Sequence, residues 1–202
     1  MQPIKYADTE RAIQPLLSRR WSPYVFDARG VAPGDLAALF EAARWAPSSY
    51  NEQPWRYLVA RREEAPAFAK LLSCLVEANQ VWARHAGALA LGVAMRSFSR
   101  NGKPNRAAEH DLGLASGNLC AEATARGLSV HQMIGILPER ARELYAIPAE
   151  AEPLTALAIG HAGENPALSE AMQQRDREPR ARKRLPDFVF SGSWAAPADF
   201  SR

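Results

Sequence analysis

The stretch Ala43-Arg44-Trp45-Ala46-Pro47-Ser48-Ser49-Tyr50-Asn51-Glu52-Gln53-Pro54-Trp55 joins a helical pattern to a strand pattern. Before it, apolar side chains recur at helical spacing from Leu36 to Ala43, and Pro47 ends that helix. After Pro54, aromatic and β-branched residues predict a strand over 55–60. Proline, serine and asparagine are common turn formers, so a plain turn is one interpretation. A binding loop is the other, because these hydroxyl and amide groups can bond the polar edge of a flat heterocycle.

Length and composition favour one globular domain over residues 1–202. The chain is 47% hydrophobic and 23% charged, which are ordinary values for a folded protein. Its 25 Lys+Arg against 22 Asp+Glu give a net charge of +3, too mild to argue for nucleic acid. The longest uncharged run, Gly127–Pro138, has 12 residues, fewer than the roughly 18 that a membrane span needs. We therefore expect neither a nucleic-acid nor a membrane partner.

The cysteine and histidine patterns favour a cytoplasmic protein without a metal site. Cys74 and Cys120 lie far apart, form no CxxC motif, and are expected to be buried, reduced thiols. The N-terminal residues contain no apolar stretch typical of a secretory signal. The four histidines have no metal-ligand spacing.

Helical and strand patterns alternate over most of the chain. Helices are expected over 9–20, 33–46, 65–85, 109–126 and 139–145, and strands over 55–60, 88–95, 129–136 and 154–160. Gly113 and Gly117 lie one turn apart and permit close helix packing. From about Gly163 the chain has no strong periodicity, yet it carries the basic run 175–184 and then three large aromatic residues, Phe188, Phe190 and Trp194. Such a tail is expected to pack against another surface.

Self-contained catalytic motifs are missing from the sequence. It has no GxGxxG, no GxxxxGK[ST] and no GxSxG. Both cysteines fall on helical faces, which argues against a reactive Cys–His pair. No catalytic side chain is assigned for this reason, and a cofactor is expected to carry the chemistry.

An ordered set of motifs resembles the nitroreductase family of FMN-dependent oxidoreductases, over nearly the whole chain. The motifs are Arg20-x-Ser22 with Phe26, the block 43–55, Asp111-Leu112-Gly113-Leu114-Ala115, Arg126-Gly127-Leu128, His131-Gln132-Met133-x-Gly135, Ala158-Ile159-Gly160, and Arg180-x-Arg182-Lys183-Arg184-Leu185. Each is weak alone, whereas the block 43–55 is fairly specific and the order is strong support.

The resemblance implies an α+β fold in which helices flank a mixed sheet, assembled as an interlocked homodimer. It implies tightly bound, non-covalent FMN at the subunit interface, with a C-terminal arm of about 164–202 packing on the partner subunit. NAD(P)H would be the co-substrate: it passes hydride to flavin N5, and a small acceptor such as a nitroaromatic or quinone is reduced in a ping-pong mechanism. The alternatives are other flavin chemistry on this fold (dehydrogenation or flavin cleavage), a non-catalytic flavin-binding protein, and a nucleic-acid binder with a basic tail.

Site residues follow from the resemblance by matching motif positions. Those expected at the FMN phosphate and ribityl chain are Arg20, Ser22, Arg182 and Arg184, with the choice among Arg180, Arg182, Lys183 and Arg184 left open. The loop expected from the partner subunit supplies Pro47, Ser48, Ser49 and Asn51, with Gln53 supporting it. Those expected near the flavin ring are Tyr24, Ile134 and Gly135, with weaker assignments for Asn79, Arg84, His131 and Gln132.

Two of these residues depart from the family pattern. Tyr24 stands where relatives often have lysine or arginine, and Ile134 stands where many have an acidic residue. Both departures lie near the expected flavin ring, so redox tuning and substrate preference do not transfer from the family. The polar loop 97–106, with its Asn-Gly turn, is expected to influence acceptor preference more than FMN content.

Overall fold

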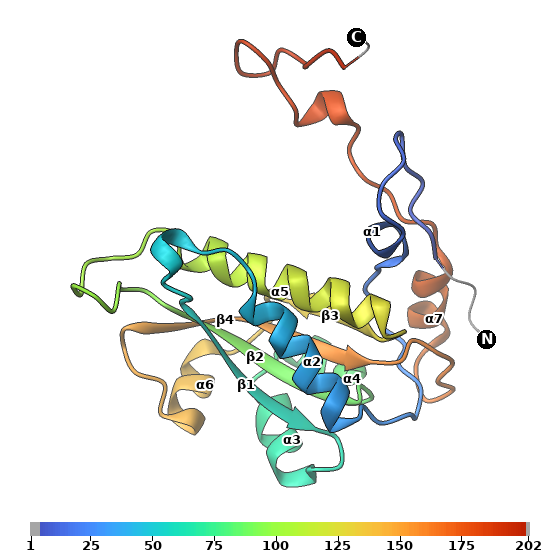
Figure 1. Ribbon diagram of the computed structural model, residues 1–202. Helices are drawn as coiled ribbons and strands as arrows, with labels where there is room; N and C mark the ends of the chain where they lie inside the picture. The colour runs from blue at the N-terminus through green and yellow to red at the C-terminus, as the bar shows by residue number, and fades with distance from the viewer. Residues whose placement is uncertain (1–4, 201–202) are drawn as a thin grey trace.

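A four-stranded sheet forms the centre of the computed structural model, which describes residues 5–200 (Figure 1). Its strands are β1 (Trp55–Arg61), β2 (Ala88–Met95), β3 (Ser129–Met133) and β4 (Ala151–Gly160), in the order β1-β2-β4-β3. All three pairings are antiparallel, with Ala90 opposite both Val59 and Leu157. The expected α+β class with flanking helices is confirmed. Within residues 5–200 the sheet is antiparallel throughout, whereas the resemblance implied a mixed one.

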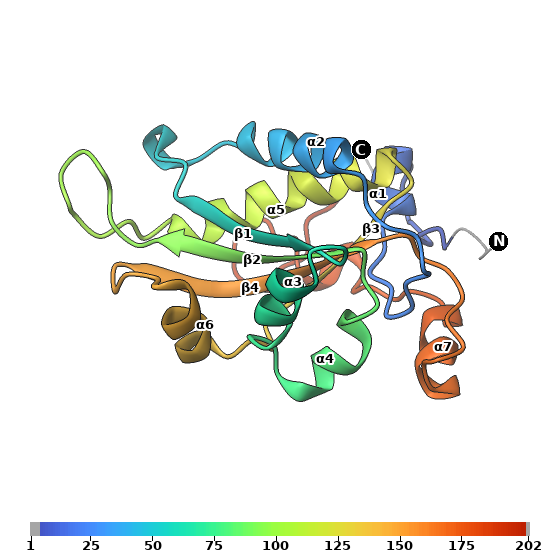
Figure 2. The same cartoon turned by 90° about the horizontal axis from the view of Figure 1, so that it is seen from below.

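Helices cover both faces of this sheet and create two hydrophobic cores (Figures 1 and 2). One face carries α2 (Pro33–Arg44) and α5 (Ala108–Ala125), which pack with the sheet through Leu39 and Leu119. The other face carries α3 (Ala65–Leu72), α4 (Glu77–Ala83) and α6 (Pro138–Tyr145), with Leu71 and Trp82 buried. Strand β2 is buried along nearly its whole length because both layers cover it.

Several helix boundaries agree with the sequence expectations for identifiable reasons. Pro33 occupies the first turn of α2, where its missing N–H leaves no bond unmade. Gly127 follows α5 with a positive φ of 71°, as expected for a glycine after a helix end. The expected burial of both cysteines is also confirmed.

Other elements differ from the expectations. The first helix, α1 (Pro15–Arg19), is shorter than 9–20 because it begins at its proline. The helix expected over 65–85 is broken into α3 and α4, because Leu75 pairs with Ile136 and the Val76 N–H bonds the Gly135 carbonyl. Strand β3 therefore ends at Met133 instead of residue 136.

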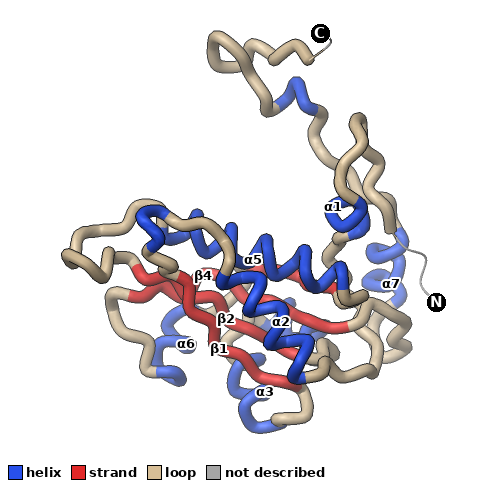
Figure 3. The backbone as a smooth tube through the Cα atoms, in the orientation of Figure 1, coloured by secondary structure: helices blue, strands red, loops and turns tan. Residues whose placement is uncertain are grey.

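The tail contains a helix that its weak periodicity did not predict. Helix α7 (Glu170–Arg177) begins at Ser169, whose hydroxyl accepts a bond from the Met172 N–H. Beyond α7, the chain leaves the body as an extended arm with one short 3₁₀ turn, η2 (Leu185–Asp187) (Figures 1 and 3). Trp194 on this arm is 89% exposed.

One face of α5 is open in the single chain. A Cβ built on Gly113 or Gly117 would meet no atom within 4 Å among the described residues. The close packing that these glycines permit is therefore not made within residues 5–200. Helix α2 packs against other residues of α5, including a bond from Asn118 to the Ala42 carbonyl.

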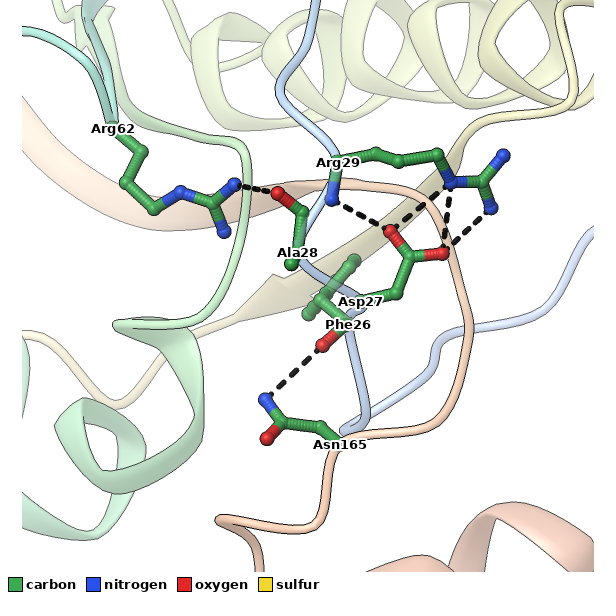
Figure 4. A network of polar contacts seen from close by, with 6 residues as sticks. All are labelled: Phe26, Asp27, Ala28, Arg29, Arg62 and Asn165. Carbon is green, nitrogen blue, oxygen red and sulfur yellow. Dashed lines mark hydrogen bonds and ion pairs between the residues drawn. The ribbon is translucent and has the colours of Figure 1, made fainter.

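A polar network fixes the turn that follows Phe26 (Figure 4). Asn165 donates to the Phe26 carbonyl at 3.2 Å, and Arg62 donates to the Ala28 carbonyl at 2.5 Å. Asp27 accepts three side-chain contacts from Arg29, which offset the effect of burial and lower the carboxyl pKa. This turn anchors one end of the segment that carries Arg20 and Ser22.

Candidate functional site

Arg20 and Ser22 lie between α1 and the anchored turn, and their side chains contact each other. The Arg20 guanidinium donates to the Ser22 hydroxyl at 3.2 Å. Burial raises the pKa of Cys120 on α5 and lowers the pKa of His131 on β3, and the charge of Arg20 acts to lower both. The two motif residues, separated by one position, therefore lie side by side. Their guanidinium and hydroxyl groups could bind the same phosphate or ribityl chain.

A cavity of about 650 Å³ lies between the N-terminal segment and the start of the arm. Its lining includes Arg20 and Arg11 from the N-terminal side and the arm residues Arg180, Arg182, Lys183 and Arg184. Asp8 and Glu10 are the acidic residues of that lining. Two motifs 160 residues apart in the sequence therefore supply cations to one hollow.

Arg180 has a different role from the arginines after it. Its guanidinium donates to the carbonyls of Lys5 (2.8 Å), Ser18 and Arg20, which fastens the arm to the N-terminal segment. Burial lowers the pKa of Arg180, and the nearby positive charges of Arg20 and Arg182 lower it further. Its Nε is buried without a hydrogen-bond partner among the described residues. An anion bound in this cavity would offset the repulsion among the positive charges of Arg20, Arg180 and Arg182.

The other arm cations are exposed. Arg184 bonds Glu10 at 3.1 Å through Nε, and Arg182 contacts only the neighbouring Ala181 carbonyl within the described chain. The donors of Arg20, Arg182 and Lys183 are accordingly available to a ligand. This donor set fits a phosphate group, because guanidinium forks bind phosphate oxygens in pairs.

Tyr24 belongs to an aromatic cluster. Its ring contacts Trp82 at 5.1 Å and His131 at 4.6 Å between centroids, both edge to face. The Arg175 guanidinium lies 4.4 Å from the Tyr24 ring centroid. His131 donates from Nδ1 to the Pro23 carbonyl at 2.8 Å, and burial lowers its pKa, so its neutral form is favoured.

Asp176 of α7 holds the backbone of this segment. Its carboxylate accepts bonds from the N–H groups of Tyr24 (3.0 Å) and Val25 (2.8 Å), and the residue is 6% exposed. Burial raises the pKa of Asp176, while these two bonds act in the opposite direction. Lys5 donates to the Asp176 carbonyl at 2.9 Å. Asp176 binds the backbone just after Ser22, and Arg180 binds the backbone carbonyls of Ser18 and Arg20. The two residues therefore fix the segment that carries Arg20 and Ser22 at both of its ends.

Gly135 and Ile134 follow β3. A Cβ on Gly135 would lie 2.4 Å from Nδ2 of Asn79, and Asn79 donates to the Gly135 carbonyl at 3.0 Å. A larger residue at position 135 would therefore displace the Asn79 side chain from this bond. Ile134 is 85% exposed. Gln132 bonds the Cys120 sulfur at 3.3 Å, whereas the Arg84 side chain donates to the Gln80 carbonyl at 3.1 Å.

The loop 47–53 lies at the opposite end of the molecule from Arg20 (Figures 1 and 2). Three of its residues, Tyr50, Asn51 and Gln53, have φ between 52° and 55°, the left-handed region that non-glycine residues seldom adopt. Gln53 bonds Ser48 through its N–H at 3.0 Å and Asn51 through its side chain at 3.2 Å, so it does contact the loop it was expected to support. Clustered strain of this kind is typical of functional loops.

Asp111 fixes this loop on α5. Its buried carboxylate accepts from the Ser49 N–H at 3.0 Å and contacts His110 Nδ1 at 3.1 Å. Sequence reasoning quoted Asp111 as a motif residue but gave it no role, and it missed Asp176 altogether. The sequence held one indication of a structural role for Asp176, since it is an acidic residue within the basic run 175–184.

The expected site residues thus fall into two groups. The cavity joins Arg20, Arg182 and Arg184, with Ser22 bonded to Arg20, whereas Tyr24, Ile134 and Gly135 do not line it. Pro47, Ser48, Ser49 and Asn51 are not brought to that cavity within one chain (Figure 1). Among residues 5–200 there is no cluster of three or more His, Cys, Asp or Glu side chains that could hold a metal, and no helix long and apolar enough to cross a membrane.

Solved structures share the fold of this chain. A solved structure described as an oxidoreductase containing FMN has a TM-score of 0.88 and 29% identity, over 97% of this chain and 100% of that one. A nitroreductase family protein from Clostridium difficile has a TM-score of 0.68 and 22% identity, over 88% of this chain and 96% of that one.

The chain belongs to the nitroreductase family, whose sequence profile matches residues 17–161. A 15.4 kDa uncharacterized protein from Mycolicibacterium smegmatis, encoded in the ask 5′ region, is 32% identical over 148 residues, 70% of this chain and 99% of that protein. Family membership and the likeness to an FMN-containing oxidoreductase support a flavin-dependent oxidoreductase.

Proposed function

We propose that the protein is an FMN-dependent oxidoreductase that takes hydride from NAD(P)H and passes it, in a ping-pong mechanism, to a small acceptor such as a nitroaromatic or quinone. One observation carries the proposal: Arg20 and the arm arginines Arg182 and Arg184 line a single cavity in a chain of this family. A phosphate-bearing cofactor is the ligand that this donor set fits best.

FMN would be held through contacts at both ends and would supply the hydride-accepting ring. Arg20, Ser22, Arg182 and Arg184 would bind its phosphate and ribityl chain. Tyr24, Ile134 and Gly135 would lie near the ring, with binding non-covalent. The chain's residues then act by binding and orienting, and no side chain is needed as a nucleophile.

A homodimer is part of the proposal. Pro47, Ser48, Ser49 and Asn51 lie far from Arg20 in one chain, so they would complete the flavin site of the partner (Figure 1). The exposed aromatic side chains of the arm, including Phe188 and Trp194, and the open face of α5 are surfaces that a partner would cover. We place the protein in the cytoplasm, since both cysteines are free thiols.

The test is a titration of the purified protein. A flavin absorbance band is expected, and NADH or NADPH should bleach it under argon. Nitroaromatic and quinone acceptors should then restore it. A band that neither dinucleotide bleaches would instead support a non-catalytic flavin-binding protein, and bleaching without reoxidation by any acceptor would point to other flavin chemistry.

The phosphate assignment has a separate test. The double variant Arg182→Ala/Arg184→Ala should lose most of its FMN on dialysis, because a hydrogen bond to a charged group contributes about 1.5–3 kcal/mol. The matched control, Lys70→Ala/Arg140→Ala, removes two exposed cations that do not line the cavity and should keep its FMN. Stoichiometric FMN in the first variant would contradict the assignment.

A further inference from the structure

The hairpin 96–106, with the sequence RSFSRNGKPNR, carries four basic residues and no acidic residue. It is an ordered element: Ser97 pairs with Pro104, and the N–H groups of Phe98 and Gly102 bond the carbonyls of Lys103 and Phe98, both at 2.8 Å. Its cations are therefore presented on a defined backbone. Hereafter "the basic hairpin" denotes residues 96–106.

The basic hairpin contacts the strained loop 47–53 directly. The Ser99 N–H donates to the Glu52 carboxylate at 2.8 Å. The rings of Tyr50 and Phe98 meet edge to face at 5.8 Å between centroids. The two segments lie side by side at the same end of the molecule (Figures 1 and 2). A ligand or a partner subunit that contacts loop 47–53 would therefore also lie near the hairpin.

Three of the four hairpin cations are free of carboxylates. Arg96 is within 4.0 Å of Glu109 and Glu152. For Arg100, Lys103 and Arg106, all exposed, no carboxylate of residues 5–200 lies within that distance. Glu52 also bonds the hairpin, but one of its carboxylate oxygens accepts from the Ser99 N–H, and it forms no ion pair with these three cations. Three hairpin cations thus have no carboxylate partner within residues 5–200.

The Arg100 side chain lies over two aromatic rings. Its guanidinium carbon is 4.2 Å from the centroid of the Tyr50 ring and 5.4 Å from that of Phe98. A cation is attracted to an aromatic face, and a guanidinium that lies over a ring can still donate N–H groups to an anion. Tyr50 is 75% exposed and has a left-handed backbone, so an unfavourable conformation presents a large ring to solvent.

The base of the hairpin holds one more unused donor. Asn105 is buried, its Oδ1 accepts from the Ala107 N–H at 3.0 Å, and its Nδ2 has no partner among the described residues. A buried donor without an acceptor is unfavourable by about 1–3 kcal/mol. An oxygen from water or from a bound anion would satisfy it.

We propose that the basic hairpin, through Arg100 stacked on Tyr50 together with Lys103 and Arg106, binds the 2′-phosphate of NADPH and makes NADPH the preferred reductant. The inference rests on the proposed function, in which loop 47–53 borders the flavin site of the partner subunit. In this proposal the adenosine half of a dinucleotide whose nicotinamide reaches that flavin extends past the loop toward the basic hairpin, which contacts the loop. NADH and NADPH share every group except the 2′-phosphate, which is the anion the free cations can recognise.

The experiment compares the two reductants in the FMN-loaded protein, for wild type, Arg100→Ala, Arg100→Lys and Lys103→Ala/Arg106→Ala. The ratio of kcat/KM for NADPH to that for NADH is the measured quantity. The control, Lys70→Gln, removes an exposed cation that also lies 4.2 Å from a tyrosine ring, that of Tyr145, but on α3. FMN content and Tm are recorded for each variant, so misfolded protein is recognised.

Wild type should favour NADPH, and Arg100→Ala should lower the ratio by at least about fivefold, mainly through the KM for NADPH. Arg100→Lys should recover part of it, since charge returns without the planar fork. Raising the salt concentration should lower the wild-type ratio, because exposed charges are screened beyond about 8 Å at physiological ionic strength. Lys70→Gln should leave the ratio unchanged.

Two results would overturn the inference without touching the proposed function: a wild type that bleaches equally with both reductants, or an Arg100→Ala ratio within twofold of wild type. Absence of bleaching by either reductant would instead refute the proposed function itself. A drop in kcat/KM for both reductants by the same factor would show that the hairpin shapes the pocket without reading phosphate, which also overturns the inference.

Discussion

Tyr24 shares its surroundings with a cation from the tail. Lysine or arginine often stands at this position in the family, and here the Arg175 guanidinium lies 4.4 Å from the Tyr24 ring centroid. We therefore expect Arg175, 151 residues later in the chain, to supply the positive charge that position 24 lacks. This pairing could not be read from the sequence, because Arg175 is one of several arginines in a run without periodicity.

Arg175→Gln should lower the flavin midpoint potential by about 10–30 mV, since about 30 mV corresponds to 1.4 kcal/mol for a two-electron couple. The reason is that a nearby cation stabilises the negative charge that reduction adds to flavin. Tyr24→Lys should shift the potential in the opposite direction. Spectroelectrochemical titration in one buffer gives both values, with Arg177→Gln on the same helix as control. An unchanged potential in Arg175→Gln would separate this cluster from the flavin.

His131 should make stability depend on pH. Burial lowers its pKa from the ordinary value of 6.5, so between the folded pKa and 6.5 the unfolded chain binds more protons than the folded one. Stability is therefore complete above about pH 6.5 and decreases as the pH falls below it. His85 and His161 are shifted in the same direction by burial and should add to the effect.

The measurement is Tm across this range. His131→Asn keeps a side-chain donor for the Pro23 carbonyl but cannot titrate, so the fall in Tm on acidification should become shallower without vanishing. Equal slopes for wild type and variant would show that His131 is not the group responsible.

At the scale of elements, sequence reasoning succeeded where periodicity was strong and local. Helix α2, strand β2 and helix α5 were located within a few residues because each has a continuous apolar face. The break between α3 and α4 was missed because it depends on pairing with Ile136, 61 residues away. Helix α7 was missed because its one buried residue is the acidic Asp176, and most of its other residues are exposed, so it has no apolar face.

The sequence likewise predicted some residues of the site and missed others. Arg20, Ser22, Arg182 and Arg184 could be named from motif spacing, and three of the four line one cavity. The groups that position them, Asp176 and Arg180, act through backbone carbonyls and N–H groups, which no residue pattern marks. The strain in loop 47–53 is likewise a property of backbone angles and not of residue type.

Asp176→Ala should weaken FMN binding more than riboflavin binding. Without the carboxylate, the Tyr24 and Val25 N–H groups lose their acceptor, at about 1–3 kcal/mol, and the segment carrying Arg20 loses its fixed position. Riboflavin lacks the phosphate, so a displaced Arg20 should affect it less. Asp176→Asn, which keeps one acceptor oxygen, should fall between wild type and Asp176→Ala.

Glu170→Gln is the matched control, since it changes an exposed carboxylate on the same helix. The measured quantity is the ratio of the two dissociation constants, with Tm of the flavin-free protein recorded alongside. An equal loss of affinity for FMN and riboflavin would mean that Asp176 only stabilises the fold.

At the scale of the molecule, the proposed dimer accounts for two features of the single chain. The arm extends from the body with exposed aromatic residues, and the strained loop 47–53 lies at the opposite end of the molecule from α1 and the start of the arm (Figure 1). Two copies arranged so that loop 47–53 of one meets the Arg20 segment of the other would bring the two groups of site residues together. The basic hairpin of the first copy would then lie beside the flavin of the second.

Such an assembly couples folding, dimerisation and FMN binding. Since each binding event stabilises the folded state by mass action, Tm should rise with protein concentration and with added FMN. Removing residues 188–202 eliminates the exposed aromatic part of the arm yet keeps Arg182, Arg184 and the Asp187 carboxylate that accepts from the Arg184 N–H, so an effect on FMN is expected to come through assembly. The shortened chain should show a Tm that no longer depends on protein concentration, and it should hold FMN more weakly than the full chain. Light scattering and thermal unfolding over a hundredfold range of concentration measure both properties. A full-length chain that is monomeric by light scattering and still retains stoichiometric FMN would refute the shared site, because loop 47–53 would then have no flavin to reach.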